Sequence, residues 1–366
     1  MNQDYRNYGI DLLKIVAMGM ILVLHLLGHG GILKELASSP PEFLSTESIV
    51  WLLEAGALCA VNCYGILTGY NLYGVGIKLN KIICLYLQII FYSAGITFVF
   101  YYTNISIGTP ILIKSVFPIL CTCYWYITAY FGTLFFVPMV NNFVSNSSRF
   151  TLNIILIMIF SVFSALPTIF GLDPFKINNG YSTLWLLVLY IFGAYIKKYD
   201  IKGVIYFKYY VVAVLFSWGS KICMELFIFY VVGNIKNFNM FIRYTSPSIV
   251  LAAIFLVLTF NSIKISNKKM EKIIRLLAST SLGVYLIHEH PLIRVSLVKN
   301  SMIRFADMTT IELIFVILII AIIVYLFCSC VDFVRNKLFK YLKINLFVDR
   351  ICRFIEEKVH YLLNGK

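Results

Sequence analysis

The apolar stretches of this 366-residue chain are long enough to cross a lipid bilayer, and this length constrains the fold more than any other feature. Crossing the hydrocarbon core takes about 20 residues of helix. Stretches such as residues 313–327 are apolar on every face, whereas the strands of a transmembrane barrel are short and alternate between apolar and polar residues. The sequence therefore predicts an all-α integral membrane protein, a polytopic helical bundle.

The composition agrees with a membrane location. Hydrophobic residues make up 60% of the chain and charged residues 13%, whereas a soluble domain has roughly 25% charged residues. The net charge of +14 would suggest nucleic-acid binding in a soluble protein. Here the basic residues lie between the apolar stretches and near the C-terminus, so we expect no nucleic-acid partner. The nine cysteines form no CxxC pair, which indicates neither a metal site nor a disulfide framework.

Ten apolar stretches are candidates for transmembrane helices. The expected spans are 8–29, 48–72, 80–103, 123–143, 150–170, 181–197, 204–230, 244–263, 273–293 and 309–333. With these spans, most of the 31 Lys and Arg residues lie on the same side as the N-terminus. Positive residues collect on the cytoplasmic side of multi-pass proteins. We therefore expect cytoplasmic N- and C-termini in a plasma or inner membrane.

The region after the last span has a different pattern. Residues 335–366 mix Leu, Phe, Ile and Val with regularly placed Lys and Arg, which is typical of one or two amphipathic helices on a lipid surface. The chain thus divides into a transmembrane domain, residues 1–334, and a basic amphipathic cytoplasmic tail, residues 335–366.

The first span carries four polar residues on one narrow stripe. At 100° per residue, Asp11, Lys14, His25 and His29 fall within about 60° of one another. A charged residue facing lipid would cost several kcal/mol, so the stripe should face protein or a water-filled cavity. Lys14 and His25 are about 16 Å apart along the axis, so they cannot both touch one reacting atom.

Each residue of this stripe also has an ordinary structural interpretation. Asp11 and Lys14 lie in the first two turns and could reach the membrane interface with their side chains. His29 is close to the opposite surface and could be an interfacial residue. His25 lies four turns into the span, where it could be a buried histidine hydrogen-bonded across helices.

Other polar positions give weaker indications. Glu54 lies in the second span. Lys221 and Glu225 are four residues apart in the seventh span, a spacing at which opposite charges on a helix neutralise each other. Residues 288–290 read His-Glu-His, which is either a site or a cap at the membrane surface, and the spacing is not the HExxH pattern of a zinc site. Trp125 and Tyr126 open the fourth span, where an aromatic belt is the usual interpretation.

Four short segments, taken in order along the chain, resemble the acyltransferase 3 family of integral membrane acyltransferases. The family has an arginine, ten residues and then a histidine in its first helix, and here Lys14 and His25 occupy these positions. Thr68-Gly69-Tyr70 is similar to its Ser-Gly-Tyr, and Trp125-Tyr126 to its Trp-Phe or Trp-Tyr. Residues 283–288, Gly-Val-Tyr-Leu-Ile-His, resemble its late Tyr-x-Ile-His segment.

The resemblance implies a bacterial O-acetyltransferase of polysaccharides or glycolipids at the cell surface. The acyl donor would be cytoplasmic acetyl-CoA, with no permanently bound cofactor and no metal. Lysine in place of the family arginine keeps the positive charge but loses the planar fork that binds phosphate bidentately. We expect this branch to use a point charge at Lys14. The oligomeric state, including a homo-oligomer, stays open.

The expected mechanism places catalysis at His25, Lys14 and Asp11. The CoA phosphates would be held by Lys14, Lys78 and Lys81, with Asp11 orienting or neutralising Lys14. His25 would act as general base on the acceptor hydroxyl or would first accept the acetyl group as an acyl-imidazole. Further candidate donor- or substrate-binding residues are Thr68, Tyr70, Trp125, Tyr126, His288 and Glu289.

Two other function classes fit a polar stripe inside a membrane protein. A transporter or flippase for a glycan or a lipid-linked precursor would also place charged residues along a cavity. It would, however, favour broken helices or internal repeats, which the sequence does not show. A non-catalytic membrane sensor would be expected to have a separate ligand-binding or signalling domain.

Overall fold

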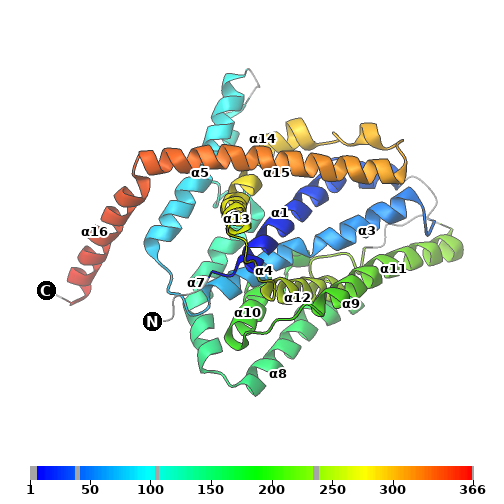
Figure 1. The fold of residues 1–366 in the computed structure, drawn as a ribbon, viewed down its shortest axis with the longest axis horizontal. Helices are drawn as coiled ribbons and strands as arrows, with labels where there is room; N and C mark the ends of the chain where they lie inside the picture. Colours follow the sequence, from blue (N-terminus) through cyan, green and yellow to red (C-terminus); the bar gives the residue numbers. More distant parts are fainter. Residues whose placement is uncertain (1–5, 38–41, 104–106, 234–238, 365–366) are drawn as a thin grey trace.

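A computed structural model of the chain describes residues 6–37, 42–103, 107–233 and 239–364, and these residues contain helices and no strand. Figure 1 shows the arrangement. The helices are α1 (Tyr8–Gly28), α2 (Ile32–Leu36), α3 (Thr46–Leu58), α4 (Ala60–Leu72), α5 (Leu79–Tyr102), α6 (Thr109–Val116), α7 (Trp125–Asn146), α8 (Arg149–Phe160), α9 (Leu166–Phe170), α10 (Thr183–Tyr199), α11 (Tyr206–Val232), α12 (Pro247–Asn261), α13 (Lys268–His288), α14 (Pro291–Ile293), α15 (Thr310–Tyr341) and α16 (Ile344–Asn364).

The prediction of an all-α polytopic membrane protein is confirmed. Seven helical segments of the described chain are long and apolar enough to cross a membrane, and each matches an expected span: α1, α3 with α4, α5, α7, α8 with α9, α11 and α15. The other three expected spans coincide with α10, α12 and α13. They are less clear by length and composition, because α10 has 17 residues, α12 has 15, and α13 begins with charged residues.

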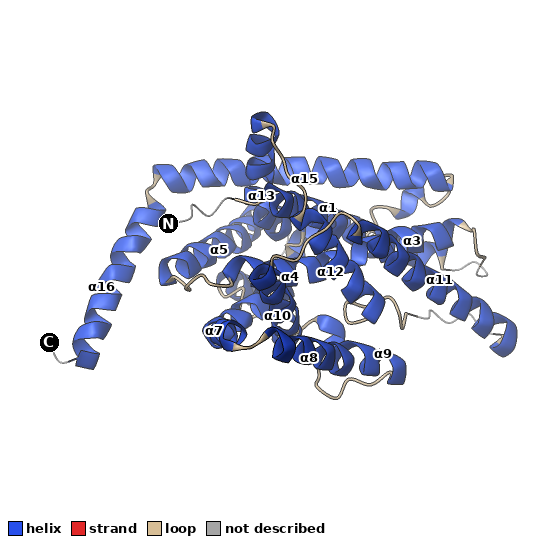
Figure 2. Ribbon diagram, turned by 60° about the horizontal axis from the view of Figure 1, so that its bottom comes forward, coloured by secondary structure: helices blue, strands red, loops and turns tan. Residues whose placement is uncertain are grey.

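Helix α1 lies at the centre of the bundle. It packs against α3, α4, α12, α13 and α15, and Figure 2 shows it among these helices in a second view. Most of its length is therefore shielded from lipid by protein, which explains how it can carry polar residues within a span.

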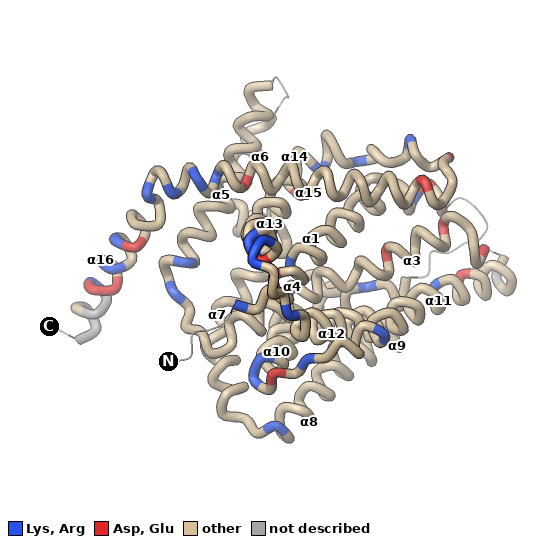
Figure 3. The backbone as a smooth tube through the Cα atoms, viewed as in Figure 1, with Lys and Arg blue, Asp and Glu red and all other residues tan. Residues whose placement is uncertain are grey.

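The last two helices differ in detail from the expected tail. Helix α15 continues to Tyr341, so residue 335 lies inside it, and α16 follows as one separate helix. Lys and Arg gather on the last turns of α15, whereas α16 carries both basic and acidic residues (Figure 3). Helix α16 contacts α5, where Asn80 donates a hydrogen bond to Asp349 at 2.7 Å. Its apolar side chains Phe347 and Phe354 are exposed, as expected for a helix on a lipid surface.

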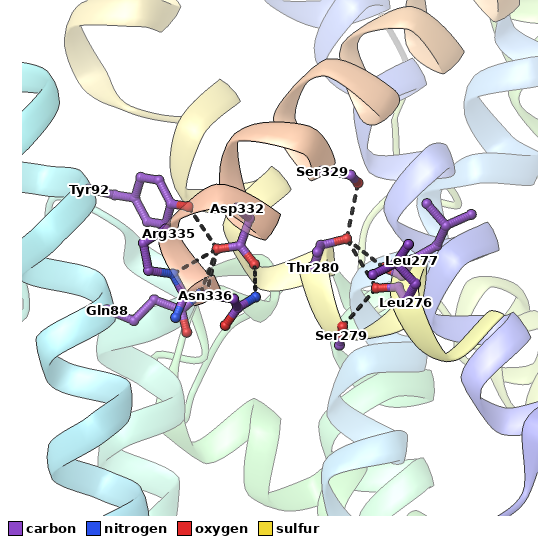
Figure 4. Close-up of polar contacts among 10 residues, drawn as sticks. All are labelled: Gln88, Tyr92, Leu276, Leu277, Ser279, Thr280, Ser329, Asp332, Arg335 and Asn336. Atoms are coloured by element: carbon purple, nitrogen blue, oxygen red, sulfur yellow. Dashed lines mark hydrogen bonds and ion pairs between the residues drawn. The ribbon is translucent and has the colours of Figure 1, made fainter. Parts of the chain in front are cut away.

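A buried ion pair within α15 is contacted by residues of α5 and α13 (Figure 4). The Asp332 carboxylate accepts hydrogen bonds from Arg335 and Tyr92, both at 2.7 Å. Gly283 of α13 packs directly on it, because a Cβ atom there would lie 2.3 Å from Cγ of Asp332. Arg335, assigned to the tail from the sequence, is thus part of the helical bundle.

Helices α4 and α10 approach each other closely through glycines. Gly65 and Gly69 are spaced as in a GxxxG motif, which brings helix backbones together inside membranes. A Cβ atom on Gly69 would lie 2.0 Å from the carbonyl oxygen of Tyr190, and one on Gly193 would lie 1.9 Å from the carbonyl oxygen of Ile66. This contact holds α4, and with it Thr68, against the rest of the bundle.

We predict that Gly69→Ala destabilises the protein by about 1–3 kcal/mol or more, because the added methyl group meets a backbone atom that cannot rotate away. The measurement is the thermal unfolding midpoint in detergent. Gly95→Ala is the matched control, since nothing lies within 4 Å of a Cβ atom there and alanine favours the helix. Equal midpoints for the two variants would contradict the prediction.

Candidate active site

His25 of α1 is joined to α13 by a chain of hydrogen bonds. Its Nδ1 lies 2.9 Å from Nε2 of His288, and Nδ1 of His288 lies 2.6 Å from the carbonyl oxygen of Val284. A carbonyl oxygen only accepts, so Nδ1 of His288 carries a proton and its Nε2 is the acceptor. Nδ1 of His25 must then donate. Nε2 of a neutral His25 is left with a free lone pair, the form that a general base requires.

A carboxylate lies beside the same nitrogen of His25. Glu289 Oε2 is 3.2 Å from His25 Nδ1, and its Oε1 accepts a hydrogen bond from Arg294 at 2.6 Å. The chain places Glu289 here because α13 ends at His288 and Pro291 begins α14, so a tight turn follows the helix. A carboxylate at this distance stabilises the imidazolium that forms when Nε2 takes a proton.

His29 completes the group at the end of α1. Its Nε2 lies 3.9 Å from Glu289 Oε2.

The group also has the composition of a metal site. Ligand atoms of His25, His29 and Glu289 lie within 4.8 Å of one another. Glu289 is already paired with Arg294, and Nδ1 of His25 carries a proton in the chain derived above. We therefore interpret these side chains as acid–base groups.

His25 lines two cavities of different character. The first, which we call the apolar cavity, has a volume of about 220 Å³ and is lined mainly by aromatic and aliphatic side chains, including Trp125, Tyr126 and Tyr285, together with the polar Thr68. The second, which we call the polar cavity, has a volume of about 520 Å³ and is lined by several charged side chains. Its lining histidines, carboxylates and arginines are His25, His29, Glu54, Glu289, Arg243 and Arg294.

A third cavity continues from the apolar one. This lysine cavity has about 300 Å³ and is lined by Lys78 and Lys81, at the beginning of α5. It shares Leu85 and Tyr130 with the apolar cavity. The apolar and polar cavities share His25, Trp125 and Tyr244. The three cavities therefore follow one another in the order lysine, apolar and polar, and His25 lies between the apolar and the polar cavity.

Buried polar atoms without a hydrogen-bond partner are concentrated at these cavities. In the described part of the chain they are Trp51 Nε1, Glu54 Oε2, Asn80 Oδ1, Tyr285 Oη and Glu289 Oε2. All except Asn80 belong to residues that line the apolar or the polar cavity. Leaving such groups unpaired costs free energy, so unpaired groups in a native fold call for an explanation such as a ligand.

Asp11 and Lys14 lie apart from His25. Asp11 is buried and pairs with Lys14 at 2.9 Å and with Arg6 at 2.5 Å. Lys14 lines none of the three cavities, although its backbone carbonyl accepts a hydrogen bond from Tyr64, which lines the apolar cavity. The stripe thus divides into a charged group at the beginning of α1, Asp11 with Lys14, and a histidine group toward its end, His25 with His29.

Tyr70 also lies away from the cavities. Its hydroxyl donates to Asn261 at 2.7 Å, and it packs between α4 and α12. The other candidates do border a cavity or contact His25. They are Thr68, Lys78, Lys81, Trp125, Tyr126, His288 and Glu289.

Several site residues were missed from the sequence. Arg294, Tyr181 and Tyr244 line the polar cavity, but each is a single polar or aromatic residue near the end of a span. No motif or spacing sets them apart. Glu54 did give a signal, because a carboxylate within a span is penalised by lipid.

Comparison with known proteins gives one result. The model of the acyltransferase 3 family, described as an acyltransferase domain, matches residues 7–331. No curated protein and no solved structure matches the chain. The matched region contains all three cavities and the whole histidine group.

Proposed function

This chain belongs to the acyltransferase 3 family of membrane acyltransferases, and we propose that it moves an acetyl group from cytoplasmic acetyl-CoA to a hydroxyl of a cell-surface polysaccharide or glycolipid. The observation that carries the proposal is the position of His25. It borders both an apolar and a polar cavity, and its hydrogen bonds leave Nε2 free to act as a base.

The donor is proposed to enter from the lysine cavity. Lys78 and Lys81 would bind the CoA phosphates as point charges, and the pantetheine arm would pass Leu85 and Tyr130 into the apolar cavity. Asp11 forms ion pairs with both Arg6 and Lys14. This group of one acidic and two basic residues therefore has a net positive charge. In our proposal it attracts the phosphates toward the beginning of α1 and does not touch the reacting atoms.

The acceptor is proposed to enter through the polar cavity. Nε2 of His25 takes the proton of the acceptor hydroxyl while the oxygen of that hydroxyl attacks the carbonyl carbon of the thioester. Collapse of the tetrahedral intermediate breaks the C–S bond, and the leaving thiolate takes the proton from the imidazolium to give CoA–SH. Because one ring borders both cavities, donor and acceptor can be bound together, which favours direct transfer over an acyl-imidazole.

Two neighbours support these steps. Glu289, 3.2 Å from Nδ1 of His25, would stabilise the imidazolium. Tyr285 borders the apolar cavity, and its buried hydroxyl has no partner among the described residues. It is available to donate a hydrogen bond to the oxygen that becomes negative in the tetrahedral intermediate.

The test is acetyl-CoA consumption by the purified protein in proteoliposomes. We predict release of CoA thiol that rises at least about tenfold, equivalent to 1.4 kcal/mol of barrier, when surface glycan from the source cell is added. The acetyl group should appear on the glycan in an amount equal to the thiol. No thiol release with any glycan fraction, together with glycan movement across the bilayer, would instead support the transporter class.

A further inference from the structure

Two residues of α3 that line the polar cavity each carry a buried polar atom that has no hydrogen-bond partner among the described residues. The two atoms are Nε1 of Trp51 and Oε2 of Glu54. Residues three apart in a helix lie on one face, so the two side chains enter the cavity from neighbouring positions. One is a donor and the other is an acceptor.

A group that both accepts and donates, such as a hydroxyl, can satisfy both atoms at once. It accepts one hydrogen bond and donates another, so it can accept from the indole N–H of Trp51 and donate to the carboxylate of Glu54. An ammonium group only donates, so it would leave the indole N–H of Trp51 without an acceptor; a carboxylate or phosphate only accepts, so it would leave an ionised Glu54 without a donor. The terminal torsion of a glutamate side chain is soft, so either oxygen of Glu54 can turn toward the cavity.

The rest of the cavity suits a ring with apolar faces. Trp125 lies 4.4 Å from Tyr181 and 6.1 Å from Tyr244 between ring centroids, and all three line the cavity. The amine of Lys221 lies 3.9 Å from the ring centroid of Trp51, which fixes the indole by a cation–π contact. Aromatic walls with a few convergent polar groups are typical of small-molecule sites.

We propose that Trp51 and Glu54 together recognise one hydroxyl of a pyranose ring in the acceptor. This inference rests on the proposed function for its biological meaning, because the sugar would be the acceptor held beside His25. The pair is a specificity determinant: it selects a sugar with a free hydroxyl at the recognised position, while a different hydroxyl of that sugar faces His25 and is acetylated.

The test is equilibrium dialysis of the purified full chain with radiolabelled methyl β-D-glucopyranoside and its four monodeoxy analogues, without any CoA compound. The wild-type protein should bind one deoxy analogue about 10- to 100-fold more weakly than the parent, the effect of losing a hydrogen bond to a charged group. Glu54→Ala and Trp51→Phe should each weaken binding of the parent about tenfold or more. Both should abolish the discrimination against that same analogue.

Controls separate recognition from folding. Glu54→Gln keeps the size of the side chain and removes its charge, and it should also lose most of the discrimination while unfolding at the wild-type temperature. Glu42→Gln makes the same change on the exposed loop before α3 and should bind like the wild type. Unchanged discrimination in Glu54→Ala, or no binding of the glucoside by the wild type, would overturn the proposal.

The outcome is independent of the transferase assay. Dialysis contains no donor, so a failed thiol-release experiment with intact Glu54-dependent binding would reject the proposed transfer and keep the sugar site. Successful transfer with unchanged binding in the Glu54 and Trp51 variants would reject the sugar site and keep the transfer.

Discussion

Replacing His25 with alanine is expected to lower the rate of acetyl transfer by about 10²- to 10⁴-fold, the usual contribution of a general base. The reason lies in its hydrogen bonds. Nδ1 is committed to His288 and faces Glu289, so Nε2 is the nitrogen able to accept the proton of the acceptor. Thiol release and acetyl-glycan formation should fall together, because both come from the same step.

A second variant distinguishes the base from its surroundings. His25→Gln keeps a polar side chain of similar reach that can donate to His288, but it has no basic nitrogen. It should unfold near the wild-type temperature and be as inactive as His25→Ala. Full activity of either variant at equal expression would show that His25 is not the base. Trapping of an acetyl group on His25 in the wild type would replace direct transfer by an acyl-imidazole.

The membrane-embedded fold could be predicted from the sequence because hydropathy alone decides it. The expected spans match helices in the structure, since about 20 apolar residues have few alternatives to a transmembrane helix. The extent of α15 could not be predicted. Its last turns are polar, and Arg335 is held in the bundle by Asp332 and by its place on the helix, which no hydropathy pattern shows.

The site was predictable only in part, because its residues come from distant parts of the chain. His25 and His288 are 263 residues apart, and no spacing rule relates them. The resemblance to a family placed both among the candidates without joining them. Thr68 and Tyr70 belong to one segment but have different surroundings, because Tyr70 is about 200° around the helix from Thr68. Tyr70 therefore faces α12, while Thr68 faces the apolar cavity.

The Trp125–Tyr126 pair shows why an aromatic pair at a helix end does not by itself locate a site. Tryptophan and tyrosine at a helix end normally mark the membrane interface. Here α7 begins at Trp125, and both rings line the apolar cavity within protein. Whether an aromatic at a helix end meets lipid or protein depends on the neighbouring helices, and a single sequence does not give their positions.

Replacing Tyr285 with phenylalanine is expected to have opposite effects on activity and stability. Its ring is buried, but its hydroxyl has no hydrogen-bond partner among the described residues. Removing an unpaired buried hydroxyl should leave the free energy of unfolding unchanged or slightly increased. If this hydroxyl donates to the oxyanion of the tetrahedral intermediate, its loss should lower kcat by about 10²- to 10³-fold, as for other oxyanion donors.

Tyr124→Phe provides the matched control. Tyr124 is a neighbour of Tyr285, with ring centroids 5.9 Å apart, but its hydroxyl donates to the carbonyl oxygen of Leu286 at 3.0 Å. Its replacement should therefore cost about 1 kcal/mol of stability and leave kcat near the wild-type value. Measuring kcat and the thermal unfolding midpoint for both variants gives a crossed pattern. A Tyr285→Phe protein that keeps its kcat, or loses activity only in proportion to lost folded protein, would show that the oxyanion is stabilised by another group.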